Sequence, residues 1–201
     1  LISELATLEF NAELTALENV DVSGSTEQQK AKDMFLIGCY TGLRISDIKR
    51  ISPHRIRNGS IEITQKKNRK LNSVPLLPQL DAILKRYNYH APKISEQQVN
   101  ESIKLVCDKA GINTPTFKKI KKAGKLIESI HPKHELITTH SAGKTFISLA
   151  GDRWGLRPEE IAAIVGKDVK TILSYYLDPD AEAAKQKIIE AENRAQMKIV
   201  G

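Results

Sequence analysis

Residues 41–47 read Thr-Gly-Leu-Arg-Ile-Ser-Asp, and this stretch decides the predicted fold. It follows the dense apolar positions of residues 27–40, which predict a central and largely buried helix that breaks at Thr41-Gly42. Helical spacing then resumes over residues 43–51 until Ser52-Pro53. Arg44 therefore stands at a helix start just after a glycine break, where its guanidinium can project from an apolar bed toward an anion.

Asp47 follows Arg44 by one helical turn and could hold its guanidinium in place. The alternative is an ordinary local ion pair between Arg44 and Asp47, which is common on helices and carries no function. The two residues alone do not decide between these interpretations.

The sequence outside this stretch predicts helices around one small sheet. Ile61 and Ile63 alternate with polar residues and Val74-Pro75 closes the segment, so residues 60–74 predict a β-hairpin or a three-stranded sheet. Its turn is basic and contains Lys66, Lys67, Arg69 and Lys70. Further helical patterns occupy residues 1–17, 78–87, 95–110, 128 onward, 139–151, 158–165 and 169–176. The predicted fold class is mainly α with a small antiparallel β-sheet or hairpin (α+β).

The hydrophobic content of 40% over 201 residues suffices for one well-buried domain. We expect this domain to span residues 1–180. Residues 181–201 predict a polar helical tail with too few apolar positions for a core of its own, so it must dock on something.

The chain carries 31 Lys and Arg against 24 Asp and Glu, a net charge of +7. Dispersed basic residues of this kind favour a polyanion partner, although a soluble basic protein without such a partner is an equal alternative on charge alone. Residues 115–125 interleave five lysines, among them Lys118 and Lys119, with Phe117 and Ile120. This segment is either a surface that follows phosphates or, more commonly, a solvated lysine face.

The two cysteines, Cys39 and Cys107, lie in apolar stretches without the spacing of a metal site or a disulfide. They are typical of buried thiols in a reducing compartment. No stretch approaches the roughly 18 apolar residues that a membrane span requires. We therefore expect a cytoplasmic protein with no membrane association, no metal and no cofactor.

Two later segments could also carry chemistry. Thr139 can cap the helix that follows it, which would put His140 at a helix N-terminus, where an anion is favoured. Gly166-Lys167-Asp168 makes a turn into another helix, which bears Tyr175-Tyr176. A lone histidine is usually structural and a tyrosine pair is usually packing, so each signal is weak alone.

The order of these features resembles the tyrosine recombinase family, the integrases of phages, transposons and conjugative elements. Residues 41–47 reproduce the family's first signature in full, and the resemblance extends over essentially the whole chain. It implies the catalytic-domain fold of that family for residues 1–180. It also implies that the tail packs either in cis or on a neighbouring protomer.

The resemblance also implies roles for single residues. Arg44 matches the first catalytic arginine, which binds a non-bridging oxygen of the scissile phosphate. Lys67, with Lys66 as the alternative, matches the lysine that protonates the leaving 5′ oxygen. His140 matches the histidine of the His-x-x-Arg motif. Tyr175 matches the nucleophile if the alignment follows residues 169–171, whereas counting from Gly166 selects Tyr176.

Two positions depart from the family pattern. Gly143 stands where the second catalytic arginine is expected. The chain reads Gly166-Lys167 where the family usually has Gly-His or Gly-Trp. Lys167 can still donate to a phosphate, but Gly143 has no side chain to donate. Losing one transition-state donor costs on the order of a hundred- to a thousandfold in rate. Lys144 lies about 100° around the helix from position 143 and is not expected to reach the same oxygen.

The resemblance therefore implies a site-specific DNA recombinase or integrase domain that breaks and rejoins DNA through a 3′-phosphotyrosine, encoded by a phage or another mobile element. The alternative is a catalytically impaired DNA-binding or regulatory relative of the integrases. The implied partner is double-stranded DNA, with self-association on it. The expected phosphate contacts outside the catalytic set are Lys66, Arg69, Lys70, Lys118, Lys119 and Lys144.

Overall fold

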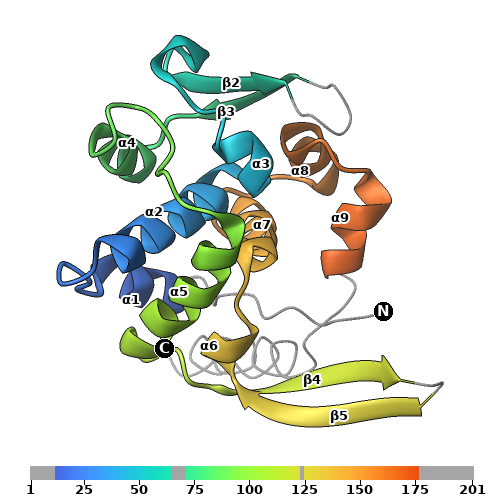
Figure 1. The fold of residues 1–201 in the computed structure, drawn as a ribbon. Helices are drawn as coiled ribbons and strands as arrows, with labels where there is room; N and C mark the ends of the chain where they lie inside the picture. The colour runs from blue at the N-terminus through green and yellow to red at the C-terminus, as the bar shows by residue number, and fades with distance from the viewer. Residues whose placement is uncertain (1–11, 65–70, 123–124, 177–201) are drawn as a thin grey trace, which may run out of the picture.

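The structure is a computed structural model that describes residues 12–64, 71–122 and 125–176. The elements lie between the three-stranded sheet at one end and a projecting hairpin at the other (Figure 1). In chain order they are α1 (Glu13–Asn19), α2 (Thr26–Thr41), α3 (Ile45–Ile48), a 3-10 turn (Pro53–Arg55), β1 (Ile56–Arg57), β2 (Ser60–Thr64), β3 (Leu71–Pro75), α4 (Pro78–Lys85), α5 (Glu96–Lys109), β4 (Pro115–Lys122), β5 (Lys125–Pro132), α6 (Lys133–Leu136), α7 (Thr139–Ser148), a π-turn (Leu149–Arg153), α8 (Pro158–Val165) and α9 (Val169–Tyr176). The mainly helical class with small antiparallel sheets is confirmed. The predicted tail, residues 181–201, lies outside the described residues.

Helix α2 is the centre of the fold and packs against α4, α5 and α7. Ser25 begins it as the N-cap, its Oγ accepting the N–H of Gln28 at 3.3 Å. Residues 31–41 are buried without interruption, because neighbouring elements surround this half of the helix. The helix ends at Gly42, whose φ of 64° is a left-handed conformation that glycine adopts without strain. The predicted buried helix and its glycine break are both confirmed.

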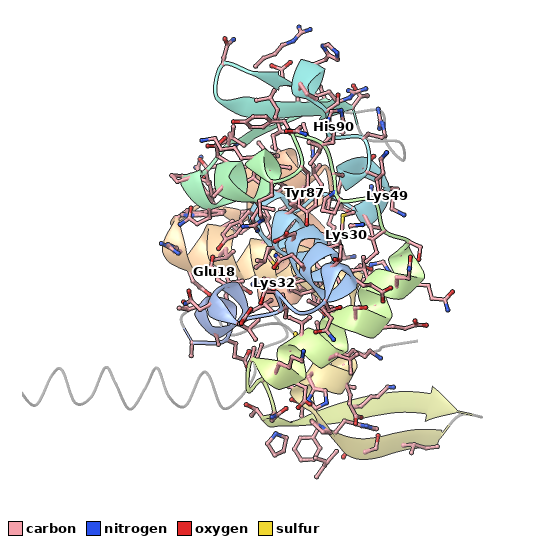
Figure 2. All side chains as sticks on the ribbon, turned by 60° about the vertical axis from the view of Figure 1, so that its left-hand side comes forward. Glu18, Lys30, Lys32, Lys49, Tyr87 and His90 are labelled. Atoms are coloured by element: carbon pink, nitrogen blue, oxygen red, sulfur yellow. The ribbon has the colours of Figure 1, made fainter. Side chains whose placement is uncertain are left out.

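Polar contacts of buried side chains hold α1 and the end of α4 against α2. Lys32 donates to the carbonyl oxygens of Glu18 and Val20, and Figure 2 shows Glu18 and Lys32 on these neighbouring helices. The buried carboxylate of Asp33 accepts hydrogen bonds from Arg86 at 2.5 Å and from the Tyr87 hydroxyl at 2.7 Å. These buried charges are therefore satisfied, and they orient the helices.

Strands β1, β2 and β3 form an antiparallel sheet in that order. The predicted segment, residues 60–74, supplies the β2–β3 hairpin, which confirms the hairpin form of the prediction, and the third strand, β1, lies before this segment. Ile61 pairs with Val74 across β2 and β3, and both side chains are buried. The strands alternate buried and exposed positions because one face of the sheet covers the core. The basic turn between β2 and β3 lies outside the described residues.

Strands β4 and β5 form a second antiparallel sheet, a hairpin that projects beyond α6 (Figure 1). The expected helix from residue 128 onward is therefore wrong, and so is the expectation of a single sheet. Phe117 faces Ile130 across the strands, and both side chains are largely exposed. Their stabilisation comes from cross-strand pairing and not from burial in the core.

The buried side chains fall into two hydrophobic clusters. The larger unites α1 to α6 with the three-stranded sheet, and the smaller joins the end of α7 to α8 and α9. Both cysteines are free and buried, as expected, and burial raises the pKa of the Cys107 thiol to about 12. Within the described part of the chain, no helix combines the length and the apolarity needed to span a membrane.

Candidate functional site

The turn at residues 41–47 is held by its own side chains. The Thr41 hydroxyl donates to the Ile37 carbonyl at 2.7 Å and accepts the N–H of Leu43 at 3.2 Å. Leu43 is buried, and Arg44 becomes the extended N-cap residue of α3. The turn thus anchors the backbone of Arg44 while its side chain stays half-exposed.

Asp47 is buried and accepts a hydrogen bond from Arg50 at 3.3 Å. The same Arg50 donates to the Thr64 carbonyl at 2.7 Å, at the end of β2. Asp47 therefore ties α3 to the sheet through Arg50. This contact gives Asp47 a structural role through Arg50, beside the two predicted interpretations of Asp47 and Arg44.

Two glycines let α2 approach α7 and α8 closely. A Cβ added to Gly38 would stand 2.9 Å from Ala142 Cβ. One added to Gly42 would stand 2.6 Å from Val165 Cγ1 and 2.7 Å from Phe146 Cδ1. Because no side chain separates the helices at these points, the turn that carries Arg44 lies directly against α7 and α8.

Helix α7 begins at Thr139, one residue earlier than the predicted cap implies. Thr138 is the N-cap, and its backbone N–H donates to Ser141 Oγ at 3.2 Å. Thr139 is already helical, and its N–H donates to Asn100 Oδ1 at 2.8 Å. The expectation that Thr139 caps the helix is therefore wrong by one residue. His140 nevertheless stays in the first turn, with an exposed side chain.

His140, Gly143 and Lys144 share one face of α7, because residues three and four apart are neighbours on a helix. A Cβ added to Gly143 would meet no atom within 4 Å. The place where an arginine side chain would begin is therefore open space.

The turn between α8 and α9 is fixed by local capping. Gly166 ends α8 with a φ of 60°, and Asp168 Oδ1 accepts the N–H of Lys170 at 2.9 Å. Lys167 lies between these two residues. This geometry directs the Lys167 side chain toward Tyr175 of α9, with its Nζ 5.1 Å from the ring centroid.

Tyr175 is the centre of a group of positive charges. Lys144 Nζ lies 5.5 Å from its ring centroid, on the same ring that Lys167 approaches. Both distances are within the range of cation–π attraction. Burial lowers the pKa of Lys167 below its ordinary value, and the charges of Arg44 and Lys144 lower it further. The structure therefore brings together Arg44, Lys144, Lys167 and Tyr175, which we call the Tyr175 cluster.

The other predicted site residues have different placements. Lys66, Lys67, Arg69 and Lys70 lie outside the described residues. Lys118 and Lys119 belong to β4 of the projecting hairpin. Helix α9 ends at Tyr176. Sequence reasoning did not anticipate that Lys144 reaches Tyr175; spacing from His140 along α7 was the signal that could have indicated it.

No group of His, Cys, Asp or Glu side chains within the described ranges has the arrangement of a metal site. The Tyr175 cluster instead offers ammonium and guanidinium donors, which suit an anion such as phosphate.

Comparison of whole folds gives a consistent result. The fold matches that of XerA recombinase with a TM-score of 0.61 at 14% identity, over 93% of this chain and 64% of that chain. The fold is that of tyrosine recombinase catalytic domains. A lambda integrase dimer bound to a COC′ core site gives a TM-score of 0.58 at 13% identity, over 85% of this chain and 58% of that one. The Tn1549 transposon integrase in complex with circular intermediate DNA gives 0.60 at 16%, over 92% and 66%.

These likenesses show the fold alone, since identities are so low. The chain spans less than two thirds of the length of these recombinases. The sequence itself matches no family model and no curated protein.

Proposed function

We propose that this chain is a DNA-binding recombinase domain that grips a backbone phosphate with the Tyr175 cluster and cleaves DNA poorly. The observation that carries the proposal is the convergence of Arg44, Lys167 and Tyr175, three residues that the family resemblance assigns to phosphate chemistry. They come from α3, the α8–α9 turn and α9, so only the folded chain assembles them.

The reaction assigned to this site is attack of the Tyr175 hydroxyl oxygen on a DNA phosphorus. The O–P bond that forms gives a 3′-phosphotyrosine, and the P–O bond to the 5′ oxygen breaks. The phenolic proton is lost, and a proton on the 5′ oxygen completes the leaving group; Lys67 is assigned to deliver it. Rejoining reverses these steps and needs no energy cofactor.

Gly143 accounts for the poor cleavage. Charge builds on the equatorial phosphate oxygens in the transition state, and preorganised donors stabilise it there. A guanidinium at position 143 would supply two such hydrogen bonds, and glycine supplies none. The alternative function, a DNA-binding or regulatory relative without turnover, rests on this same position.

The first test is duplex DNA binding at several salt concentrations. A mixed-sequence duplex of roughly 30 base pairs, about three helical turns, avoids dependence on a particular site. Each phosphate contact contributes about −0.9 to the slope of log affinity against log salt. We expect a steep slope that Arg44→Gln makes shallower by about 0.9, while Arg57→Gln, on the three-stranded sheet, serves as the matched control. Wild-type affinity that is independent of salt would contradict the proposal.

The second test restores the missing donor. Because space is open at position 143, Gly143→Arg is expected to fold. It should raise covalent adducts on randomly nicked duplex DNA by at least about tenfold, since the nick lets the cleaved end diffuse away and prevents rejoining. Denaturing gels measure the adduct. No increase in a folded variant would favour the non-cleaving relative.

A further inference from the structure

We propose that Lys144 supplies the phosphate contact that Gly143 lacks, from the next position of α7. This inference rests on the proposed function and gives one residue of the Tyr175 cluster a specific role. With Lys144, three cations still bind a DNA phosphate, although the guanidinium that fast cleavage needs is missing at position 143.

The first argument is the direction of the side chain. Lys144 follows His140 by four residues, so both project from the same face of α7. The contact with the Tyr175 ring at 5.5 Å shows that this face is turned toward α9. The 100° between positions 143 and 144 does not separate Lys144 from the site, because the long lysine side chain crosses that angle.

The second argument is electrostatic. Lys144 and Lys167 approach the same aromatic ring, and Arg44 is close enough to lower the pKa of Lys167. Gathering three like charges raises the free energy of the unliganded protein. A bound phosphate relieves this repulsion, so the cluster gains more from an anion than the same lysines would gain if they were dispersed.

The third argument is the difference between the two cations. An ammonium is a compact charge that binds phosphate well, but it lacks the planar fork of a guanidinium. Lys144 can therefore replace much of the attraction for ground-state phosphate without the bidentate geometry that favours the transition state. DNA affinity and cleavage are expected to separate in this chain for that reason.

The test measures the salt slope of duplex binding for Lys144→Met, Lys144→Arg and Lys170→Met. Lys170 is an exposed lysine on α9 and is the matched control. We expect Lys144→Met to make the slope shallower by about 0.9, and both Lys144→Arg and Lys170→Met to keep it. Circular dichroism and thermal melting check that each variant is folded.

A double variant shows whether both positions serve one phosphate. Adding Gly143→Arg to Lys144→Met should return the slope to the wild-type value, because the new guanidinium fills the vacated contact. A slope that stays at the Lys144→Met value would overturn the inference.

The remaining outcomes separate this inference from the proposed function. A salt-dependent wild type whose slope is unchanged by Lys144→Met overturns the inference alone. The inference is also overturned if Lys170→Met or Lys144→Arg makes the salt slope as shallow as Lys144→Met does. A wild type without salt-dependent binding overturns both.

Discussion

The two hydrophobic clusters differ greatly in size. The larger contains 26 buried side chains and the smaller contains seven, among the residues that the structure describes. Arg44 follows Leu43, which belongs to the larger cluster, whereas Tyr175 packs against the smaller one. The Tyr175 cluster therefore lies where the larger hydrophobic cluster meets the smaller one.

Local stability follows the amount of buried apolar surface. We infer that α8 and α9 can loosen while α2 and α5 stay folded. Loosening would carry Lys167 and Tyr175 away from Arg44, so the charge cluster depends on the smaller hydrophobic cluster. The predictions below perturb one cluster at a time.

The largest effect is expected at Tyr175, the proposed nucleophile, which packs against the smaller cluster. In the Gly143→Arg background, Tyr175→Phe should abolish the covalent DNA adduct, because phenylalanine has no hydroxyl to attack phosphorus. Tyr176→Phe should leave the adduct, since neighbouring helix positions face about 100° apart. Adduct yield on randomly nicked DNA is the measurement.

A melting curve is the control for these tyrosine variants. Removing the hydroxyl of the half-buried Tyr175 ring should change stability by less than about 1 kcal/mol. The reverse pattern, with the adduct lost only in Tyr176→Phe, would assign the nucleophile to Tyr176.

Substitutions that create a cavity in either hydrophobic cluster should have the next largest effect, a loss of stability. Ile172 and Ile103 are both fully buried, in the smaller and the larger cluster respectively. Replacing either by alanine should cost about 2–5 kcal/mol. For Ile172→Ala we expect faster amide hydrogen exchange confined to α8 and α9, whereas Ile103→Ala should lower the urea midpoint of the whole domain. Exchange that accelerates equally everywhere in Ile172→Ala would show a single cooperative unit.

The close contact between α2 and the smaller cluster can be tested at Gly42. Gly42→Ala combines left-handed strain with contacts of 2.6 and 2.7 Å, and should cost about 2–4 kcal/mol. Gly59 has a similar φ of 70° but open space around it, so Gly59→Ala should cost only about 1 kcal/mol. Urea unfolding measures both. Equal losses of unfolding free energy in Gly42→Ala and Gly59→Ala would mean that Val165 and Phe146 make room for the new methyl group without cost.

Much of the fold could be predicted because local and long-range signals agree. The apolar run of α2, the left-handed Gly42 and the alternation of β2 each serve the same buried core. The sequence pattern of the β4–β5 hairpin led to the wrong prediction of a helix from residue 128 onward. Phe117 and Ile120 are three residues apart, as are Ile127 and Ile130. That spacing imitates a helix, and the side chains of Phe117, Ile127 and Ile130 are exposed, so burial in the core does not impose a strand period on them.

The candidate site was predictable only in part. The motif and the order of the segments single out Arg44 and Tyr175, but the approach of Lys144 to the Tyr175 ring depends on how α7 and α9 pack. The open space beside Gly143 is likewise a property of packing. Such features arise from tertiary approach, which local spacing does not encode.

The smallest expected effect concerns the stability cost of the charge cluster. Burial lowers the pKa of Lys167 below 10.5, and Arg44 and Lys144 lower it further. Between the lowered pKa and 10.5 the unfolded chain holds a proton that the folded chain has lost, so stability rises with pH in that window. Below the lowered pKa the charged lysine is fully destabilising. Lys167→Met should therefore stabilise the domain at neutral pH, by about 0.5 kcal/mol or about 1–2 °C in Tm.

The same substitution should weaken DNA binding, because a bound phosphate favours the charged lysine. The gain in Tm should shrink as pH rises toward 10.5, where wild-type Lys167 becomes neutral. Lys170→Met, which removes an exposed lysine from α9, is the control and should show neither the gain nor its pH dependence. Thermal melts of wild type, Lys167→Met and Lys170→Met at several pH values measure the gain in Tm and its pH dependence. A Lys167→Met variant that is less stable than wild type at neutral pH would mean that its contact with the Tyr175 ring outweighs burial and repulsion.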